Sequence, residues 1–325
     1  MSKMAVGLGA VAAAVLSCGV SVADAQSFPS KPITIVVLYV PGAMADTTMR
    51  LIAQKVSDSV GQPVRIDNRA GGGGVIGSMV VKQAAPDGYT LLEANISSHA
   101  ANASLFPKLP YDPIKDFKPI TVLWSYPSFL VVPGGSPARS VSDLAVLAGS
   151  KAGGLTFVSQ GIGTGGHMLG AMFSSRVGLP MVHVPYKGAA PAMMDLIANR
   201  ADFFFTSYAS ADPYLKDGRL RALAIASPNR LKRYPDIPTM AESGFPDVEY
   251  DTWFGLIAPA RTPDSVVQTL NDEFIKAVRS HELVKRLTEE GLEVTTTTPA
   301  EFTELIVRDT AKVRKMIKES GAKSE

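Results

Sequence analysis

The sequence has 325 residues, a net charge of +2 at neutral pH and 46% hydrophobic residues, which is enough chain for two hydrophobic cores. A near-neutral chain without a basic run is a poor nucleic-acid binder. The sequence also lacks Cys-x-x-Cys, His-Glu-x-x-His and calcium-loop spacings, so we expect no nucleic-acid partner and no metal site.

Residues 1–25 predict an export signal. An Ala-, Val- and Leu-rich stretch at 4–22 is followed by a small-x-small cleavage site at 23–25, the usual order in secretory signals. We expect cleavage near Ala25 and a soluble periplasmic chain, because no second stretch of about 18 apolar residues follows. Two alternatives stay open: a membrane anchor, and a lipid anchor on Cys18, the single cysteine of the sequence.

Beyond the signal, apolar β-branched runs alternate with segments of helical period, which predicts βαβ units and mostly parallel sheets. The first half predicts strands at 33–38, 64–66 and 90–92 and helices at about 46–60 and 75–83. The second half predicts strands at 129–132, 155–158, 181–184, 203–206 and 223–226, a helix at 168–177 and another from Ala189.

Proline punctuates residues 227–248, which predicts a surface connector before a strand at 254–258 and helices at 264–279 and 299–318. Two helices begin with capping boxes, in which a hydroxyl and an acidic side chain satisfy the first backbone N–H groups. The pairs are Ser140 with Asp143, and Thr298 with Glu301.

This order of elements predicts an α/β fold of two lobes, a hinged clamshell with its ligand site between them. We expect the chain to cross near 123–127 and 246–252, so that lobe 1 comprises 26–124 and 250–325 and lobe 2 comprises 125–249. Such sheets bind small molecules at domain interfaces and at the carboxyl ends of parallel strands. A single larger sheet is the alternative.

The turn from Gly161 to His167 joins a predicted strand to a predicted helix. Unpaired N–H groups at such a helix start favour an anion, so Gly163 and Thr164 are candidate ligand residues. The glycine spacing also matches a dinucleotide fingerprint, but no acidic residue ends the next strand to hold a ribose. We therefore expect no cofactor, while a turn whose glycines only permit close packing stays open.

A second anion site is predicted at residues 39–46, where the first strand leads into a helix. Asp46 suits the helix N-cap, and the loop can meet a ligand as well. The four glycines at 71–74 lack the Lys-Ser/Thr of a phosphate loop, so we interpret them as a flexible loop that opens the second helix.

Other polar residues follow predicted strands. Ser97 and Ser98 follow the third strand, and Tyr186 and Lys187 follow the strand at 181–184. His167 either contacts a ligand or bonds to its own turn. Since the sequence has no Gly-x-Ser-x-Gly elbow and no metal spacing among its histidines, we expect no catalytic residue.

Several motifs stand in order along the chain. Those in the first half are Phe28-Pro29-Ser30-Lys31-Pro32-Ile33, Pro41-Gly42 with Asp46, Asp67-Asn68-Arg69, Ala85-Pro86-Asp87-Gly88-Tyr89-Thr90 and Leu109-Pro110-Tyr111-Asp112-Pro113. Those in the second half include Gly163-Thr164 with His167, Val184-Pro185-Tyr186-Lys187-Gly188, Gly218-Arg219-Leu220-Arg221-Ala222 and Pro235-Asp236-Ile237-Pro238-Thr239. Together they resemble the Bug family, the periplasmic solute-binding proteins of tripartite tricarboxylate transporters.

The resemblance implies a two-lobed periplasmic binding protein, not an enzyme, that captures a small organic acid and hands it to transporter membrane subunits. We expect a monomer. An α/β enzyme that binds a nucleotide cofactor with its glycine turns is the alternative. The ligand-binding residues that the resemblance and the motifs propose are Ala43, Met44, Asp46, Ser97, Ser98, Gly163, Thr164, His167, Tyr186 and Asp202.

The chain departs from the family pattern in the first loop. The family usually has a second glycine, a small residue and a threonine where this chain has Ala43, Met44 and Ala45. A hydroxyl is lost and a flexible apolar side chain is gained. Together with the phenylalanines at 203–205, of which one or two are expected to be core, this predicts a partly apolar or aromatic acid rather than citrate or malate.

Overall fold

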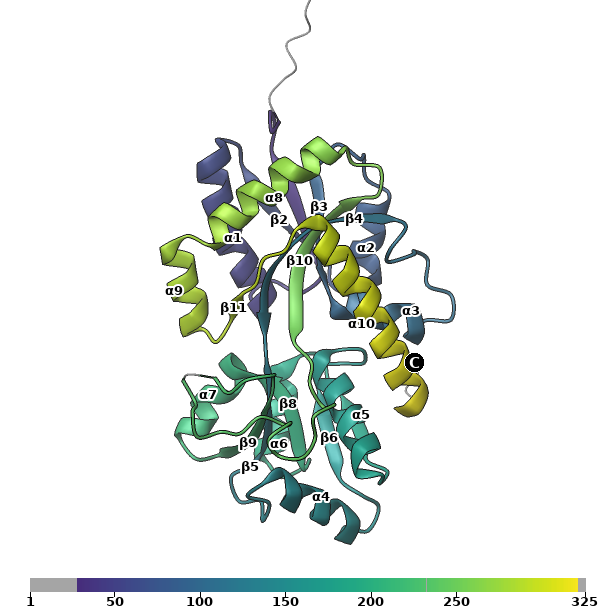
Figure 1. Ribbon diagram of the computed structural model, residues 1–325, viewed down its shortest axis with the longest axis vertical. Helices are drawn as coiled ribbons and strands as arrows, with labels where there is room; N and C mark the ends of the chain where they lie inside the picture. The colour runs from purple at the N-terminus through teal and green to yellow at the C-terminus, as the bar shows by residue number, and fades with distance from the viewer. Residues whose placement is uncertain (1–27, 232, 321–325) are drawn as a thin grey trace, which may run out of the picture.

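The computed structural model describes residues 28–231 and 233–320. The predicted export signal, its cleavage site and Cys18 lie outside the described residues. Within the described ranges, no helix is both long and apolar enough to cross a membrane. The described chain forms two lobes stacked along its longest axis (Figure 1).

The upper lobe in Figure 1 is built on a six-stranded sheet with the order β11-β4-β10-β3-β1-β2. Its strands are β1 (Ile33–Val37), β2 (Val64–Asn68), β3 (Thr90–Asn95), β4 (Phe117–Tyr126), β10 (Thr252–Pro259) and β11 (Glu293–Val294). Its helices are α1 (Met44–Val60), α2 (Val75–Lys82), α3 (Asn102–Leu105), α8 (Asp264–Val278), α9 (His281–Glu289) and α10 (Pro299–Ser320), with short helical turns at Gly72–Gly74 and Ser97–Ala101.

The lower lobe is built on a five-stranded sheet with the order β7-β6-β8-β5-β9. Its strands are β5 (Ser128–Pro133), β6 (Thr156–Ser159), β7 (Val182–Pro185), β8 (Phe203–Ser207) and β9 (Leu220–Ala226). Its helices are α4 (Val141–Ser150), α5 (Gly165–Val177), α6 (Ala189–Ile197) and α7 (Tyr208–Lys216).

Both sheets are mixed, which corrects the prediction of mostly parallel sheets. β1 pairs in parallel with β2 and β3, and β6 pairs in parallel with β7 and β8. β10 is antiparallel to β3 and β4, and β5 is antiparallel to β8 and β9. The reason is that β5 and β10 each follow a crossing between the lobes, so both run away from the other lobe. β1 and β6, which lead into α1 and α5, run the opposite way, and each ends facing the other lobe.

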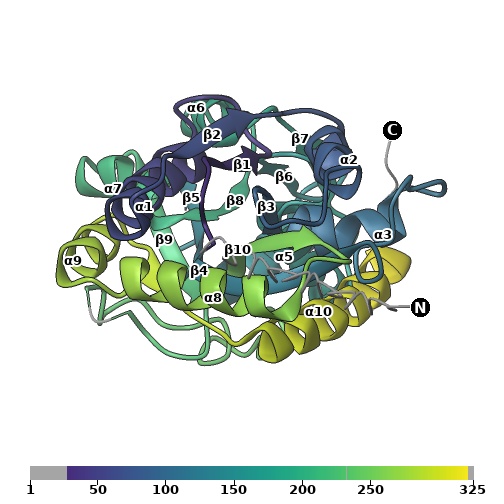
Figure 2. The same cartoon turned by 90° about the horizontal axis from the view of Figure 1, so that it is seen from above.

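Alternating residues of the strands bury side chains on both faces of each sheet. In β1, Ile35 and Val37 pack with α1 and α8, whereas Val36 joins the core beneath α2 and α10. In β8, Phe204 packs with α6 and α7, whereas Phe203 and Phe205 pack with α4 and α5. Each sheet is therefore a central layer with helices on both sides, as Figure 2 shows for the upper lobe.

The two predicted capping boxes are confirmed. The Ser140 hydroxyl accepts the N–H of Asp143 at 3.0 Å, and the Asp143 carboxylate reaches back to the N–H of Arg139. Thr298 and Glu301 each accept the other's backbone N–H. The sequence analysis missed β4, β11, α3, α7 and α9.

The C-terminal helix α10 touches both lobes. Val313 and Ile317 share one apolar core with Phe173 of α5 in the lower lobe. The Thr310 hydroxyl donates to the carbonyl of His99 in the upper lobe.

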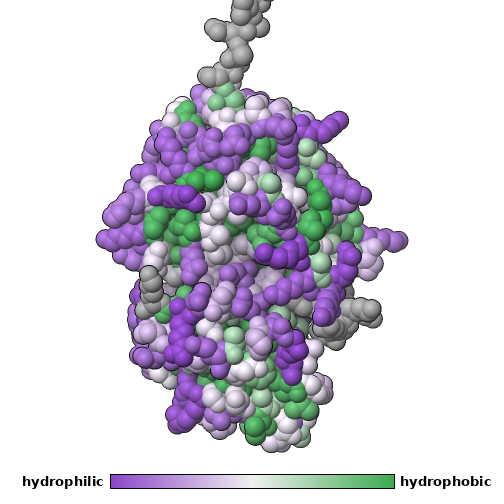
Figure 3. All heavy atoms as spheres, viewed as in Figure 1, coloured by the Kyte–Doolittle hydropathy of each residue, from purple (hydrophilic) through white to green (hydrophobic). Residues whose placement is uncertain are grey.

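The outer surface, in the view of Figure 1, is mostly hydrophilic, with scattered apolar residues (Figure 3).

The strands change from one sheet to the other between Tyr126 and Ser128 and return between Ala226 and Thr252. These positions agree in order with the two predicted crossings. The lobe bounds at 124/125 and 249/250 stay a prediction.

Candidate functional site

A cavity of about 730 Å³ lies between the two lobes. Its upper-lobe wall is formed by the loop that begins α1, by Ala70 and the glycine run at 71–74, and by the end of β3. Its lower-lobe wall is formed by the loop that begins α5, the segment after β7 and the start of α7. The two predicted anion sites, which belong to different lobes, therefore open into one cavity.

The first loop presents the start of α1 to the cavity. Ala43 is the N-cap residue, and Ala43, Met44 and Ala45 all line the cavity. The first intrahelical bond runs from the N–H of Thr47 to the carbonyl of Ala43 at 3.0 Å. The N–H groups of Met44 and Ala45 precede that bond and have no helical partner, so they are available to an anion.

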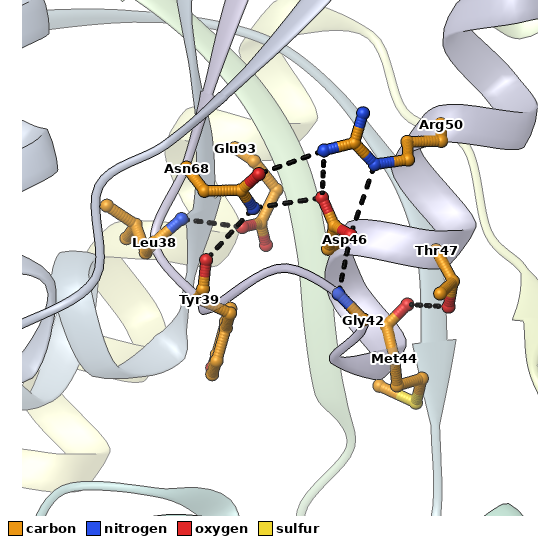
Figure 4. A network of polar contacts seen from close by, with 9 residues as sticks. All are labelled: Leu38, Tyr39, Gly42, Met44, Asp46, Thr47, Arg50, Asn68 and Glu93. Carbon is orange, nitrogen blue, oxygen red and sulfur yellow. Dashed lines mark hydrogen bonds and ion pairs between the residues drawn. The ribbon is translucent and has the colours of Figure 1, made fainter.

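Asp46 holds this loop from behind (Figure 4). Its carboxylate accepts the N–H of Gly42 at 2.8 Å, pairs with Arg50 at 2.9 Å and accepts the Asn68 amide at 2.9 Å. Burial alone would raise the pKa of Asp46, but the bonds from Arg50, Gly42 and Asn68 lower it below its ordinary value. The charge is therefore stable in a residue that is only 2% exposed.

The N-cap assignment of Asp46 was wrong. Helix α1 begins at Met44, with Ala43 as its N-cap, and Asp46 bonds backwards to Gly42. The physical reason is that Arg50 and Asn68 draw the carboxylate away from the cavity. Asp46 is not among the residues that line the cavity, so it positions the loop.

The second loop presents the start of α5. Thr164 is the N-cap residue, and its hydroxyl donates to the carbonyl of Gly161 at 2.7 Å and accepts the N–H of His167. Thr164 and Gly165 line the cavity. Gly163 does not line it, because the backbone N–H of Gly163 turns inward and donates to the His167 ring at 3.1 Å.

His167 supports the second loop from inside the lobe. His167 is 3% exposed, and its ring stacks on His183 with centroids 4.0 Å apart. Burial lowers the pKa of His167 to about 4, and burial followed by the proximity of His167 lowers the pKa of His183 to about 3. Both rings are neutral at pH 7, and His167 makes the bond to its own turn that the sequence left open.

The two predicted serines separate. Ser97 lines the cavity, and its hydroxyl donates across the cleft to the carbonyl of Gly163 at 3.1 Å. Ser98 is fully buried and bonds to Asn95 and to the His99 ring. Ser97 therefore links the lobes at the site, while Ser98 holds the end of β3.

Tyr186 lines the cavity, and its hydroxyl donates to Asp195. This bond is the main reason that the pKa of Tyr186 is raised. Asp202 lies at the far end of the lower sheet, where its carboxylate binds Lys151 and the N–H of Thr156. The prediction that places Asp202 at the site is corrected, because β8 faces the cavity with its carboxyl end and Asp202 precedes its amino end.

The apolar surface of the cavity differs from the expected one. Phe203, Phe204 and Phe205 are all fully buried in the two cores, so none of them faces a ligand. The aromatic rings that line the cavity are instead Tyr39, Phe106, Tyr126, Tyr186 and Phe254.

The sequence analysis missed several other lining residues. Ser207 and Ser210 come from the start of α7, and Thr252 comes from the strand that returns to the upper lobe. The glycine run at 71–74 also forms part of the wall. A signal existed for Ser207, which directly follows a predicted strand; Thr252 lies in a predicted crossing without a motif.

The cavity carries little formal charge. Among the described residues that line it, Lys187 is the only charged one, and its side chain is exposed. Glu93 lies behind the wall, fully buried, and accepts the N–H of Leu38 at 3.4 Å. Burial raises the pKa of Glu93 well above its usual range. No metal-binding group of three or more His, Cys, Asp or Glu residues occurs among the residues described.

Comparisons with known proteins agree with this geometry. Residues 48–322 match the sequence model of a family described as tripartite tricarboxylate transporter family receptor. A protein of the tcbD-tcbE intergenic region of Pseudomonas sp. strain P51 is 37% identical over 313 residues, covering 96% of this chain and 93% of that protein. Protein BugT of Bordetella pertussis is 32% identical over 301 residues, covering 92% of each.

Two solved structures have the same fold. Rpa4515 of R. palustris with adipate is 32% identical with a TM-score of 0.83, covering 90% of this chain and 98% of that one. MatC from Rhodopseudomonas palustris with bound malate is 31% identical with a TM-score of 0.80, covering 89% and 100%. The two-lobed α/β binding fold expected from the sequence is thereby confirmed.

Proposed function

This chain belongs to the tripartite tricarboxylate transporter receptor family, a family of periplasmic solute-binding proteins and not of enzymes; on this premise we propose that it captures a partly apolar carboxylate between its lobes. The observation that carries the proposal is the cavity, into which two helix starts from different lobes open beside a single cationic side chain. Helix N-termini favour anions because their first N–H groups are unpaired.

The geometry favours a carboxylate placed between the two helix starts. Its oxygens can accept bonds from the N–H groups of Met44, Ala45 and Gly165. The hydroxyls of Ser97 and Thr164 can join them if they turn from the carbonyls of Gly163 and Gly161, to which they donate without a ligand. Each bond to a charged group contributes about 1.5–3 kcal/mol, so three or four give about 5–12 kcal/mol before ordering costs. Micromolar binding requires about 8 kcal/mol, so these donors suffice without a buried arginine.

The body of the ligand then lies against apolar groups. Met44 and the rings of Tyr39, Phe106 and Phe254 line the same cavity. Burial of about 50 Å² of ligand carbon against Met44 contributes on the order of 1 kcal/mol. Two structural neighbours were solved with adipate and malate, which supports the carboxylate class. We propose that an aromatic or medium-chain acid binds this chain better than malate or citrate.

We also propose that the chain is exported, trimmed near Ala25 and active as a periplasmic monomer that delivers its ligand to transporter membrane subunits. The n-, h- and c-region order of residues 1–25 supports export. N-terminal sequencing of the mature protein tests it. An acylated Cys18 at the N-terminus would instead indicate a lipid-anchored protein.

Isothermal titration calorimetry tests the ligand class. The panel contains phenylacetate, benzoate, hexanoate, adipate, malate and citrate, with NAD as the probe for the nucleotide alternative. We expect micromolar binding of at least one acid, the tightest from the apolar members, and no heat from NAD. Binding of NAD, together with no heat of binding from any acid, would refute the proposal.

A further inference from the structure

A second cavity of about 660 Å³ adjoins the first. It lies between the first turns of α1, the start of α7 and helix α9. Its lining differs sharply in charge from that of the first cavity, which has only Lys187. The charged residues of the second cavity are Arg50, Asp212, Arg233, Arg286, Glu289 and Glu290.

Met44 is the one described residue that lines both cavities. Its neighbours divide between them: Ala43 and Ala45 line the first cavity, whereas Gly42 and Thr47 line the second. The start of α7 divides in the same way, since Ser207 and Ser210 face the first cavity and Tyr208 and Ala209 the second. Met44 and this turn of α7 therefore form the partition.

The backbone of Met44 is held in place. It is the first residue of α1, and its carbonyl accepts the hydroxyl of Thr47 at 3.0 Å. The loop before it is fixed through the bonds of Asp46 to Gly42 and Arg50. In Figure 4 the Met44 side chain points away from this polar network. With the lobes in the arrangement described, the partition therefore opens by rotation of the Met44 side chain and not by a shift of its backbone.

We infer that Met44 sets the length of the acid that the cleft accepts. This inference rests on the proposed function and names the selected class: acids whose body ends at the Met44 thioether. A longer chain would have to displace that side chain and enter the charged second cavity. Truncation at position 44 removes every side-chain atom beyond Cβ and joins the two cavities into one longer cleft.

The test measures a limiting chain length. Unbranched monocarboxylates and α,ω-dicarboxylates of four to ten carbons are titrated into wild type, Met44→Ala and the volume-matched control Met44→Leu. For whichever of the two acid series binds, we expect the affinity to rise with chain length and then to fall at least tenfold beyond a limiting length. That limit should move by two or more carbons in Met44→Ala and stay unchanged in Met44→Leu.

The outcomes separate the two claims. Acids that bind all three proteins with one common limiting length overturn the role of Met44 and leave the proposed function intact. Failure of every acid to bind wild type and variants refutes the proposed function and this inference with it. Thermal unfolding checks each variant, and Met44→Val, with a smaller truncation, replaces Met44→Ala if that protein does not fold.

Discussion

Replacing Gly163 by alanine should weaken ligand binding by obstructing closure of the lobes. Gly163 has a φ of +79° and belongs to the lower lobe, while Leu105 and Ala101 face it from the upper lobe. An added Cβ would lie 2.7 Å from Leu105 Cδ1 and 3.4 Å from Ala101 Cβ. Carbon atoms rest about 3.5–4.0 Å apart, so the lobes or the Leu105 side chain must shift by about 1 Å.

The expected cost has two parts. A left-handed backbone costs an alanine about 1–2 kcal/mol, and this part is the same with the lobes open or closed. Overpacking costs about 1–3 kcal/mol, and it arises only when the lobes meet. Ligand affinity depends on the second part alone, so we expect about 5- to 150-fold weaker binding.

Gly178→Ala is the matched control. Gly178 caps the C-terminus of α5, the helix that Gly163 precedes, and has a φ of +72°; its added Cβ would meet no atom within 4 Å. Thermal unfolding should show similar losses of stability for both variants, whereas calorimetry with the best-bound acid should show lost affinity only for Gly163→Ala. Adding Leu105→Ala should restore part of that affinity. Equal affinities of wild type and both folded glycine variants would refute the reasoning.

Thr164→Val removes a hydroxyl that lines the cavity, so we expect calorimetry to show about tenfold weaker binding, roughly 1.4 kcal/mol. Thr164→Ser, which keeps the hydroxyl, is the control. A larger loss of affinity from Lys187→Ala would show that the lysine charge dominates binding. Glu93→Gln removes a buried acid whose pKa is raised by burial, so the folded state keeps this proton to a higher pH than the unfolded state does. Wild type therefore loses stability as pH rises above the ordinary pKa of a glutamate. Urea unfolding at pH 5, 6 and 7 should therefore show the variant gaining stability relative to wild type as pH rises, and parallel pH profiles would contradict this. Small-angle scattering should show a smaller radius of gyration with the best-bound acid; an unchanged radius at saturation would indicate a rigid pocket.

The sequence predicted correctly those features that depend only on contacts between residues close together in the chain. The boxes at Ser140 and Thr298 need only residues within one helical turn, and both formed as expected. The starts of α1 and α5 were predicted from a similar local pattern, in which a strand and a glycine-containing turn precede a segment of helical period. Five of the ten candidate residues line the cavity: Ala43, Met44 and Thr164 at these helix starts, and Ser97 and Tyr186, which follow predicted strands.

Tertiary contacts decided the rest. Asp46 turned inward because Asn68 on β2 and Arg50 share its carboxylate, and no spacing rule within its own loop predicts that partner. The phenylalanines at 203–205 are all core because both faces of their sheet are covered. Thr252 and Phe254 reach the cavity only because β10 returns between β3 and β4.

The central place of β10 also orders the assembly of the two lobes. The lower sheet uses one continuous stretch of chain, from Ser128 to Ala226. The upper sheet cannot join β3 to β4 until Thr252–Pro259 arrives between them. Because long-range pairing pays its loop-closure entropy first, the middle of the chain can fold alone while the amino-terminal strands wait. We therefore expect the lower lobe, which interrupts the upper lobe in the sequence, to form its sheet first and the upper lobe to be completed after it.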